Sequence, residues 1–191
     1  ATEEARGLSA TGHRVLDYVG GTMSPEMELP KLLWLKRHLP QAWARYGMAM
    51  DLADFLVWKA TDDITASACT VTCKWTYLNH ENTGWQQDFL GAIGLAELQQ
   101  KLRLPAQALP VGGRAGNLSE ATARDWGLKP GIAVAVSMID AHAGALGVLG
   151  ATPEGELDQR LALIAGTSNC HMALSAEQRT VKGIWGPYYG A

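Results

Sequence analysis

Positive charge is scarce in this 191-residue sequence, in which 16 Lys and Arg stand against 19 Asp and Glu for a formal net charge of −3. Proteins that bind nucleic acid need a cationic stripe against the phosphate backbone, and none occurs here. We therefore expect a small-molecule ligand and no nucleic-acid partner.

Long apolar runs are also missing: none approaches the roughly 18 residues of a membrane span, and the first residues lack a signal-peptide core. We expect a cytoplasmic protein that does not bind membranes.

Cysteine is equally sparse, with three residues: Cys69, Cys73 and Cys170. Their number is odd and no Cys-x-x-Cys spacing occurs, which favours reduced and mostly buried thiols. A metal site formed by Cys69, Cys73 and His80 is the alternative.

A third absence concerns nucleotides. No Gly-x-x-x-x-Gly-Lys-Ser/Thr loop occurs anywhere, so a P-loop nucleotide site is excluded. The composition, 47% hydrophobic and 18% charged, is that of a globular protein, either one large domain or parts of two.

Several segments carry the periodicity and end signals of helices. Ser119 precedes a helical stretch that ends before Gly127, so a cap and a left-handed stop agree there. The stretch Ile64 to Thr72 could be strand or helix. The expected helices are Glu3–Val19, Lys31–Leu39, Asp51–Ala60, a segment around Phe89–Ile93, and Glu120–Trp126.

Two apolar runs in the second half are the most informative feature. Ile132–Ile139 ends at Asp140, and Leu161–Ala165 ends at Gly166-Thr167-Ser168. Runs of this length and composition are typical of buried strands, which predicts an α/β protein with its chemistry at strand ends. A carboxylate and a small turn of this kind are the equipment of a phosphoryl-transfer site.

The order of several motifs resembles the FGGY family of carbohydrate kinases, in its ribulokinase-like (pentulose kinase) branch. The similar segments are Pro30–Leu35, Asp54–Thr61, Cys73-Lys74-Trp75, Leu109–Asp140, Gly166–Met172 and Trp185–Tyr189. The resemblance implies part of the actin/hexokinase/RNase H-like sugar-kinase fold. It places the end of the first, substrate-side domain at residues 1–139 and the beginning of the second, nucleotide-side domain at 140–191.

The family's Asp-x-Gly-Thr phosphate loop and Gly-rich adenosine loop are not found in these residues. We therefore expect the chain to be the middle of a longer kinase and to be inactive alone.

For Asp140, the resemblance implies a general base that takes the proton of the attacking sugar hydroxyl, and a contact to Mg²⁺ through water. From the residues alone, Asp140 could instead cap the following turn. Gly166, Thr167 and Ser168 resemble the family's phosphate loop and would bind the γ-phosphate of ATP, whereas an ordinary hairpin turn is the alternative.

Lys74 resembles the lysine that contacts the ketose, and Trp75 could offer its ring to the sugar. A surface lysine beside a core tryptophan is the other interpretation. His142 and His171 flank the expected site, where a structural role is the more common one for histidine. Trp185–Tyr189 could line the sugar pocket or pack in the core.

Together these features predict ATP- and Mg²⁺-dependent phosphorylation of a ketopentose such as D-ribulose. A kinase for another sugar or polyol, and a non-catalytic sugar-binding or regulatory module on the same scaffold, are the alternatives. Assembly into a homo-oligomer is left open.

Overall fold

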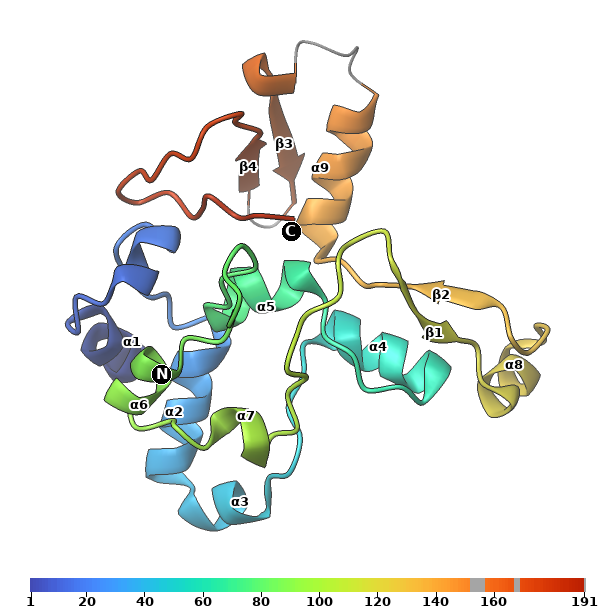
Figure 1. Cartoon of the computed structure of the whole chain (residues 1–191), viewed down its shortest axis with the longest axis horizontal. Coiled ribbons are helices and arrows are strands. Elements are labelled where there is room, and N and C mark those ends of the chain that lie inside the picture. The colour runs from blue at the N-terminus through green and yellow to red at the C-terminus, as the bar shows by residue number, and fades with distance from the viewer. Residues whose placement is uncertain (152–156, 167–168, 191) are drawn as a thin grey trace.

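The computed structural model describes residues 1–151, 157–166 and 169–190. Figure 1 shows three parts: a body of helices, an extended arm formed by β1, β2 and α8, and a separate unit in which α9 lies beside β3 and β4. We call these the helical body, the β-arm and the α9 unit. None of the helices in the described ranges combines the length and apolar character that crossing a bilayer requires.

The helical body contains most of the helices. In chain order they are α1 (Thr2–Ser9), the 3₁₀ helix η1 (Arg14–Tyr18), α2 (Glu28–His38), α3 (Pro40–Arg45), α4 (Leu52–Thr61), α5 (Ala68–Trp75), α6 (Gln87–Ala92) and α7 (Leu98–Lys101). One hydrophobic core joins all of these helices except α4, and Met27, Phe89 and Leu98 are fully buried in it. The ambiguous stretch Ile64 to Thr72 is not a strand: it leads into α5 and forms the first part of that helix.

The expected helix Glu3–Val19 is wrong as a single element. It is split into α1 and η1, because Thr11 Oγ1 donates a hydrogen bond to Leu8 O and Gly12 adopts a φ of +63°. A positive φ interrupts a right-handed helix, so the chain turns there before η1 begins.

In the β-arm, β1 (Arg114–Asn117) pairs antiparallel with β2 (Ala133–Ala135), and α8 (Glu120–Trp126) connects them. The prediction for α8 is confirmed at both ends, since Ser119 Oγ accepts a hydrogen bond from Thr122 N and Gly127 has a φ of +69°. Ala60 on α4 packs with Leu118 and Ala123, which attaches the arm to the helical body.

The α9 unit consists of α9 (Asp140–Gly150), the 3₁₀ helix η2 (Leu157–Gln159), and the antiparallel strands β3 (Leu161–Ala165) and β4 (Asn169–Ala173). A Cβ at Gly144 would lie 3.1 Å from the Ile164 side chain, so glycine permits α9 to lie close against β3. The expected strand at Leu161–Ala165 is present, but only Ala162 is fully buried in it. It is half-buried because α9 covers one of its faces.

The run Ile132–Ile139 is not the buried strand that its composition predicts. Only Ala133–Ala135 is strand, and Ala133 and Ala135 are exposed, because the run pairs only with the short strand β1. The mixed helix and strand content agrees with the expected α/β class.

Candidate functional site

The segment that leads into α9 lies along α5. At the start of α5, Ser67 Oγ donates a hydrogen bond of 2.6 Å to Ser137 O. Near the end of α5, Cys73 Sγ lies 3.5 Å from His142 Nε2. These contacts carry the chain across α5 and bring it to Asp140.

A buried carboxylate on α4 fixes this arrangement. Asp54, which is 3% exposed, accepts hydrogen bonds from Ser67 N at 3.1 Å, Thr70 Oγ1 at 2.6 Å and Ser137 Oγ at 2.6 Å. Burial raises the pKa of Asp54, and the donors oppose that rise by favouring the charged form. One side chain therefore ties α4, the start of α5 and the approach to Asp140 together.

Asp140 is the first residue of α9 rather than the last residue of a strand, so the predicted position at a strand end is wrong. The chain leaves the β-arm after Val136, whose N–H still bonds to Gly113 O, because Ser137 is bound by Ser67 and Asp54 instead. Asp140 is exposed, and its Oδ1 accepts a 2.7 Å hydrogen bond from Ala141 N. The carboxylate thus lies at the start of the helix and faces solvent.

Gly166 follows β3 at the end of the α9 unit where α9 starts. Figure 1 shows that β3 runs toward the beginning of α9. Gly144, one helical turn after Asp140, lies against the side chain of Ile164, which is two residues before Gly166. The strands on both sides of the turn are in register, with Ala165 opposite Asn169. Thr167 and Ser168, the other two residues predicted to bind phosphate, lie outside the described residues.

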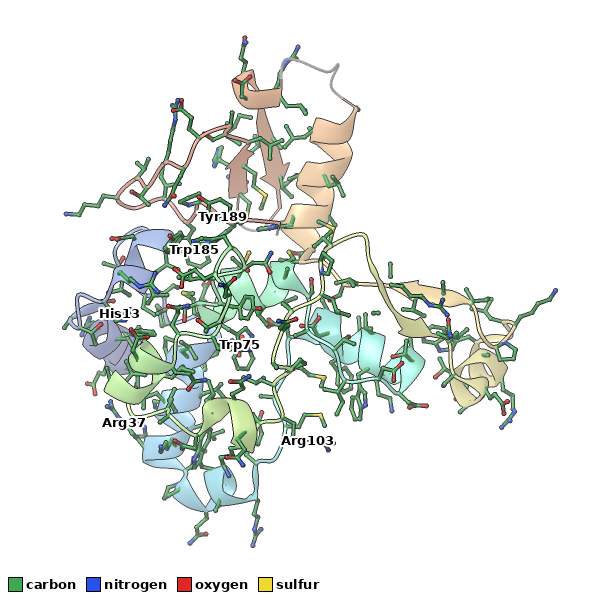
Figure 2. The ribbon with its side chains drawn as sticks, in the orientation of Figure 1. His13, Arg37, Trp75, Arg103, Trp185 and Tyr189 are labelled. Carbon is green, nitrogen blue, oxygen red and sulfur yellow. The ribbon has the colours of Figure 1, made fainter. Side chains whose placement is uncertain are left out.

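Lys74 lies in the last turn of α5, next to Cys73. Its Nζ is 5.3 Å from the ring centroid of Trp185, a cation–π distance. Trp185 belongs to the C-terminal segment 183–190, which returns to the helical body by a bridge between Val19 and Trp185 and a hydrogen bond from Gly186 N to Tyr18 O. In Figure 2, Trp185 and Tyr189 lie between the helical body and the α9 unit. The ammonium group is therefore held against the C-terminal segment.

Trp75 does not face the same way. It is 2% exposed in the core, and its Nε1 donates a 2.5 Å hydrogen bond to Asp51 Oδ2. Figure 2 shows it inside the helical body, away from Trp185. A buried indole has no face to offer a sugar, so the structure favours the core interpretation and Trp75 is not part of the site that we propose.

The residues that could hold Mg²⁺ fit a simple arrangement. Asp140 is an exposed carboxylate, and no trio of acidic groups close enough to cage an ion occurs in residues 1–151, 157–166 and 169–190. Mg²⁺ is commonly bound by one or two carboxylates together with water and substrate phosphates. Asp140 has the chemistry for such a site, and its contact with Mg²⁺ through water stays a prediction.

The three cysteines are free; Cys69 and Cys73 are buried and Cys170 is half-buried, in line with the expectation of reduced thiols. The hydrogen bond from the Cys73 thiol lowers the pKa of Cys69 to about 5. The same bond, together with burial, raises the pKa of Cys73.

A hollow of the described structure lies elsewhere. It has a volume of about 750 Å³ and runs along the β-arm between Thr61, Asp63 and residues 114–120. It contains none of the predicted site residues, because Asp140 and Lys74 lie at the junction of the helical body and the α9 unit.

Sequence reasoning missed Asp54, Ser67 and Ser137 as residues that position the site. Their partners are 13 to 83 positions apart in the chain, so no local spacing indicates the network. The one available signal is an acidic residue, Asp54, in a helix whose following residues are apolar.

Residues 2–147 match the N-terminal domain of the FGGY family of carbohydrate kinases. The chain is 49% identical over 197 aligned residues to an FGGY carbohydrate kinase domain-containing protein of Xenopus laevis, covering 96% of the chain and 35% of that relative. It is 35% identical over 216 residues to a D-ribulokinase of Saccharomyces cerevisiae, covering 98% of the chain and 30% of the relative.

Among solved structures, the xylulose kinase of Rhodospirillum rubrum superposes with a TM-score of 0.72 at 19% identity, over 93% of this chain and 35% of that one. This likeness supports the fold alone. The chain spans about a third of the length of the relatives it matches. Because the family match covers most of its residues, the chain belongs to the FGGY family of carbohydrate kinases.

Proposed function

We propose that this chain is part of an ATP-dependent kinase that phosphorylates a ketopentose, with D-ribulose as the favoured substrate and its 5-hydroxyl as the attacking group. The contact between Cys73 and His142 carries the proposal. It joins the residue before Lys74 to the residue two places after Asp140, and we propose that the Lys74 ammonium group on α5 and the Asp140 carboxylate on α9 face one site.

Each residue then has a separate task. Asp140 accepts the proton of the sugar hydroxyl as its oxygen attacks the γ-phosphorus and ADP leaves. Lys74 donates hydrogen bonds to sugar oxygens, and the ring of Trp185 limits the directions that its ammonium group can take. Backbone N–H groups at Gly166 are suited to approach a phosphate closely, since glycine has no Cβ.

Mg²⁺, when bound with ATP, would neutralise charge on the phosphates, and Asp140 is the residue of this chain that would hold it through water. Thr167 and Ser168 complete the proposed phosphate loop. The domain boundary after residue 139 stays a prediction, with the substrate side before it and the nucleotide side after it.

The choice of D-ribulose is supported by the similarity to a D-ribulokinase along nearly the whole chain. The chain spans about a third of its relatives, and positioning catalysis fails when part of the site is missing. We therefore expect the 191-residue chain alone to show no turnover.

The test is ADP formation by the full-length protein that contains this chain, measured against D-ribulose, other pentuloses, hexuloses and polyols. We expect D-ribulose to give the highest kcat/KM in the panel. A different sugar or polyol at the top would move the substrate assignment within the kinase class. Binding of a ketose with no ADP formed from any member would favour a non-catalytic sugar-binding module.

A further inference from the structure

Three side chains outside the proposed chemistry converge between α5 and α9. Cys69 Sγ, Cys73 Sγ and His142 Nε2 all lie within 4.8 Å of one another. Within the described ranges, this is the one set of three such groups close enough to hold an ion. Cys69 and Cys73 are four residues apart on α5 and therefore share a helix face, whereas His142 comes from the first turn of α9.

The distances fit a tetrahedral metal site. Zinc binds sulfur at about 2.3 Å and histidine nitrogen at about 2.0 to 2.1 Å, and two such ligands at the tetrahedral angle are about 3.5 Å apart. Cys73 Sγ and His142 Nε2 are 3.5 Å apart. Two sulfurs on the same zinc are about 3.8 Å apart by the same geometry, which is within the 4.8 Å that bounds the cluster.

The surroundings of the cluster supply a second observation. The Tyr188 hydroxyl is buried and has no hydrogen-bond partner within the described structure. The Tyr188 ring faces the ring of His142, with centroids 6.4 Å apart and planes at 30°. A buried hydroxyl without a partner is costly, and a water molecule held on a metal would supply the missing bond.

We propose that Cys69, Cys73 and His142 form a binding site for Zn²⁺ or another thiophilic divalent cation, with water in the fourth position beside Tyr188. Soft thiolate ligands select such a cation, whereas the exposed carboxylate of Asp140 suits Mg²⁺, so the two ions occupy different sites. The bound cation joins α5 to α9 and sets the separation of Lys74 from Asp140. This site does not depend on the proposed substrate.

The site differs from the alternative that the sequence suggests, in which His80 is the third ligand. His80 Nε2 lies 3.1 Å from the Tyr18 hydroxyl, and its ring lies against Tyr189 with centroids 4.2 Å apart. His80 is absent from the cluster, and His142 takes its place. Because His80 is outside the cluster and His142 is inside it, His80→Gln is a matched control for His142→Gln.

The experiment is a titration of the reduced, metal-free chain with Zn²⁺ in competition with a chromophoric chelator. We expect one Zn²⁺ per chain. Removing an outer-shell residue from a metal site costs roughly 10- to 100-fold in affinity, so Cys69→Ala, Cys73→Ala and His142→Gln should each weaken binding by at least about 100-fold. Cys170→Ala and His80→Gln should bind as the wild-type chain does.

Co²⁺ as a probe gives an independent readout. Wild-type chain should show the intense visible bands of a tetrahedral ion and a thiolate charge-transfer band, and His142→Gln should lose the tetrahedral pattern. Circular dichroism identifies any variant that fails to fold. If a cysteine variant fails to fold, the result for His142→Gln decides the test, because this substitution leaves α5 unchanged. Absence of one-to-one binding by the wild-type chain, or equal affinity in the His142→Gln and His80→Gln variants, would overturn the proposal.

Discussion

Asp51 illustrates how a single residue can oppose folding while it makes a good contact. Its carboxylate accepts the hydrogen bond of the buried Trp75 indole, yet removal from water raises its pKa to about 6. The hydrogen bond lowers the pKa, as does Lys31, but burial is the larger effect. The charged form of Asp51 is therefore better solvated in the unfolded chain than in the folded one.

This imbalance predicts a pH dependence of stability. Between the ordinary pKa of 3.8 and the folded value of about 6, the folded protein binds more protons than the unfolded chain. The free energy of unfolding must then fall as the pH rises through that window. The shift corresponds to a loss of about 1 to 3 kcal/mol, the lower end allowing for partial contact with solvent.

Asp51→Asn keeps an oxygen that can accept the Trp75 hydrogen bond and removes the charge. We expect its stability to match wild type near pH 4 and to exceed it by about 1 to 3 kcal/mol at pH 7, measured by urea unfolding. Because burial also raises the pKa of Asp54, some pH dependence should remain. Asp125→Asn, on the exposed side of α8, is the control; if both variants follow the wild-type pH profile, the burial effect at Asp51 is absent.

At the scale of elements, the position of the C-terminal segment 183–190 depends on its packing against Gly20. Gly20 O accepts a 2.8 Å hydrogen bond from Gly183 N, and a Cβ on Gly20 would lie 2.9 Å from the backbone of Gly183 and Ile184. Gly20 also has a φ of +71°. Its neighbour Gly21 has a φ of +88° but nothing within 4 Å of the same added atom.

The two glycines therefore separate conformational strain from contact. We expect Gly21→Ala to cost about 1 kcal/mol through strain alone, and Gly20→Ala to cost about 2 to 4 kcal/mol because the segment must also move. Displacement of the segment should increase tryptic cleavage after Lys182 in the Gly20 variant only. Equal cleavage and equal loss of stability in both would show that segment 183–190 does not rest on Gly20.

The elements also show which parts of the structure local sequence can predict. α8 was predictable at both ends because its cap, its stop and its helix lie within nine consecutive residues, from Ser119 to Gly127. The start of α9 was not. Whether Ile132–Ile139 continues as a strand depends on Ser67 and Asp54, which belong to other elements far along the chain.

At the scale of the whole molecule, motif order predicted the family, whereas the details of the site needed the structure. Asp140 and Lys74 are 66 positions apart in the chain, and the helices that carry them meet at a contact, Cys73 to His142, that no motif suggested. Trp75 follows Lys74 directly but points into the core, because neighbouring residues on a helix face different directions. Periodicity could have indicated that difference; the third ligand beside Cys69 and Cys73 could not be found without coordinates.

The most direct test of the central claim, that Asp140 is the general base of a sugar kinase, is ADP formation by Asp140→Asn in the full-length protein with D-ribulose. Asparagine preserves the shape and the Ala141 N–H contact but cannot take a proton at neutral pH. We predict that kcat falls by about 100- to 10,000-fold and that circular dichroism shows a retained fold. Turnover equal to that of the wild-type protein would contradict the account.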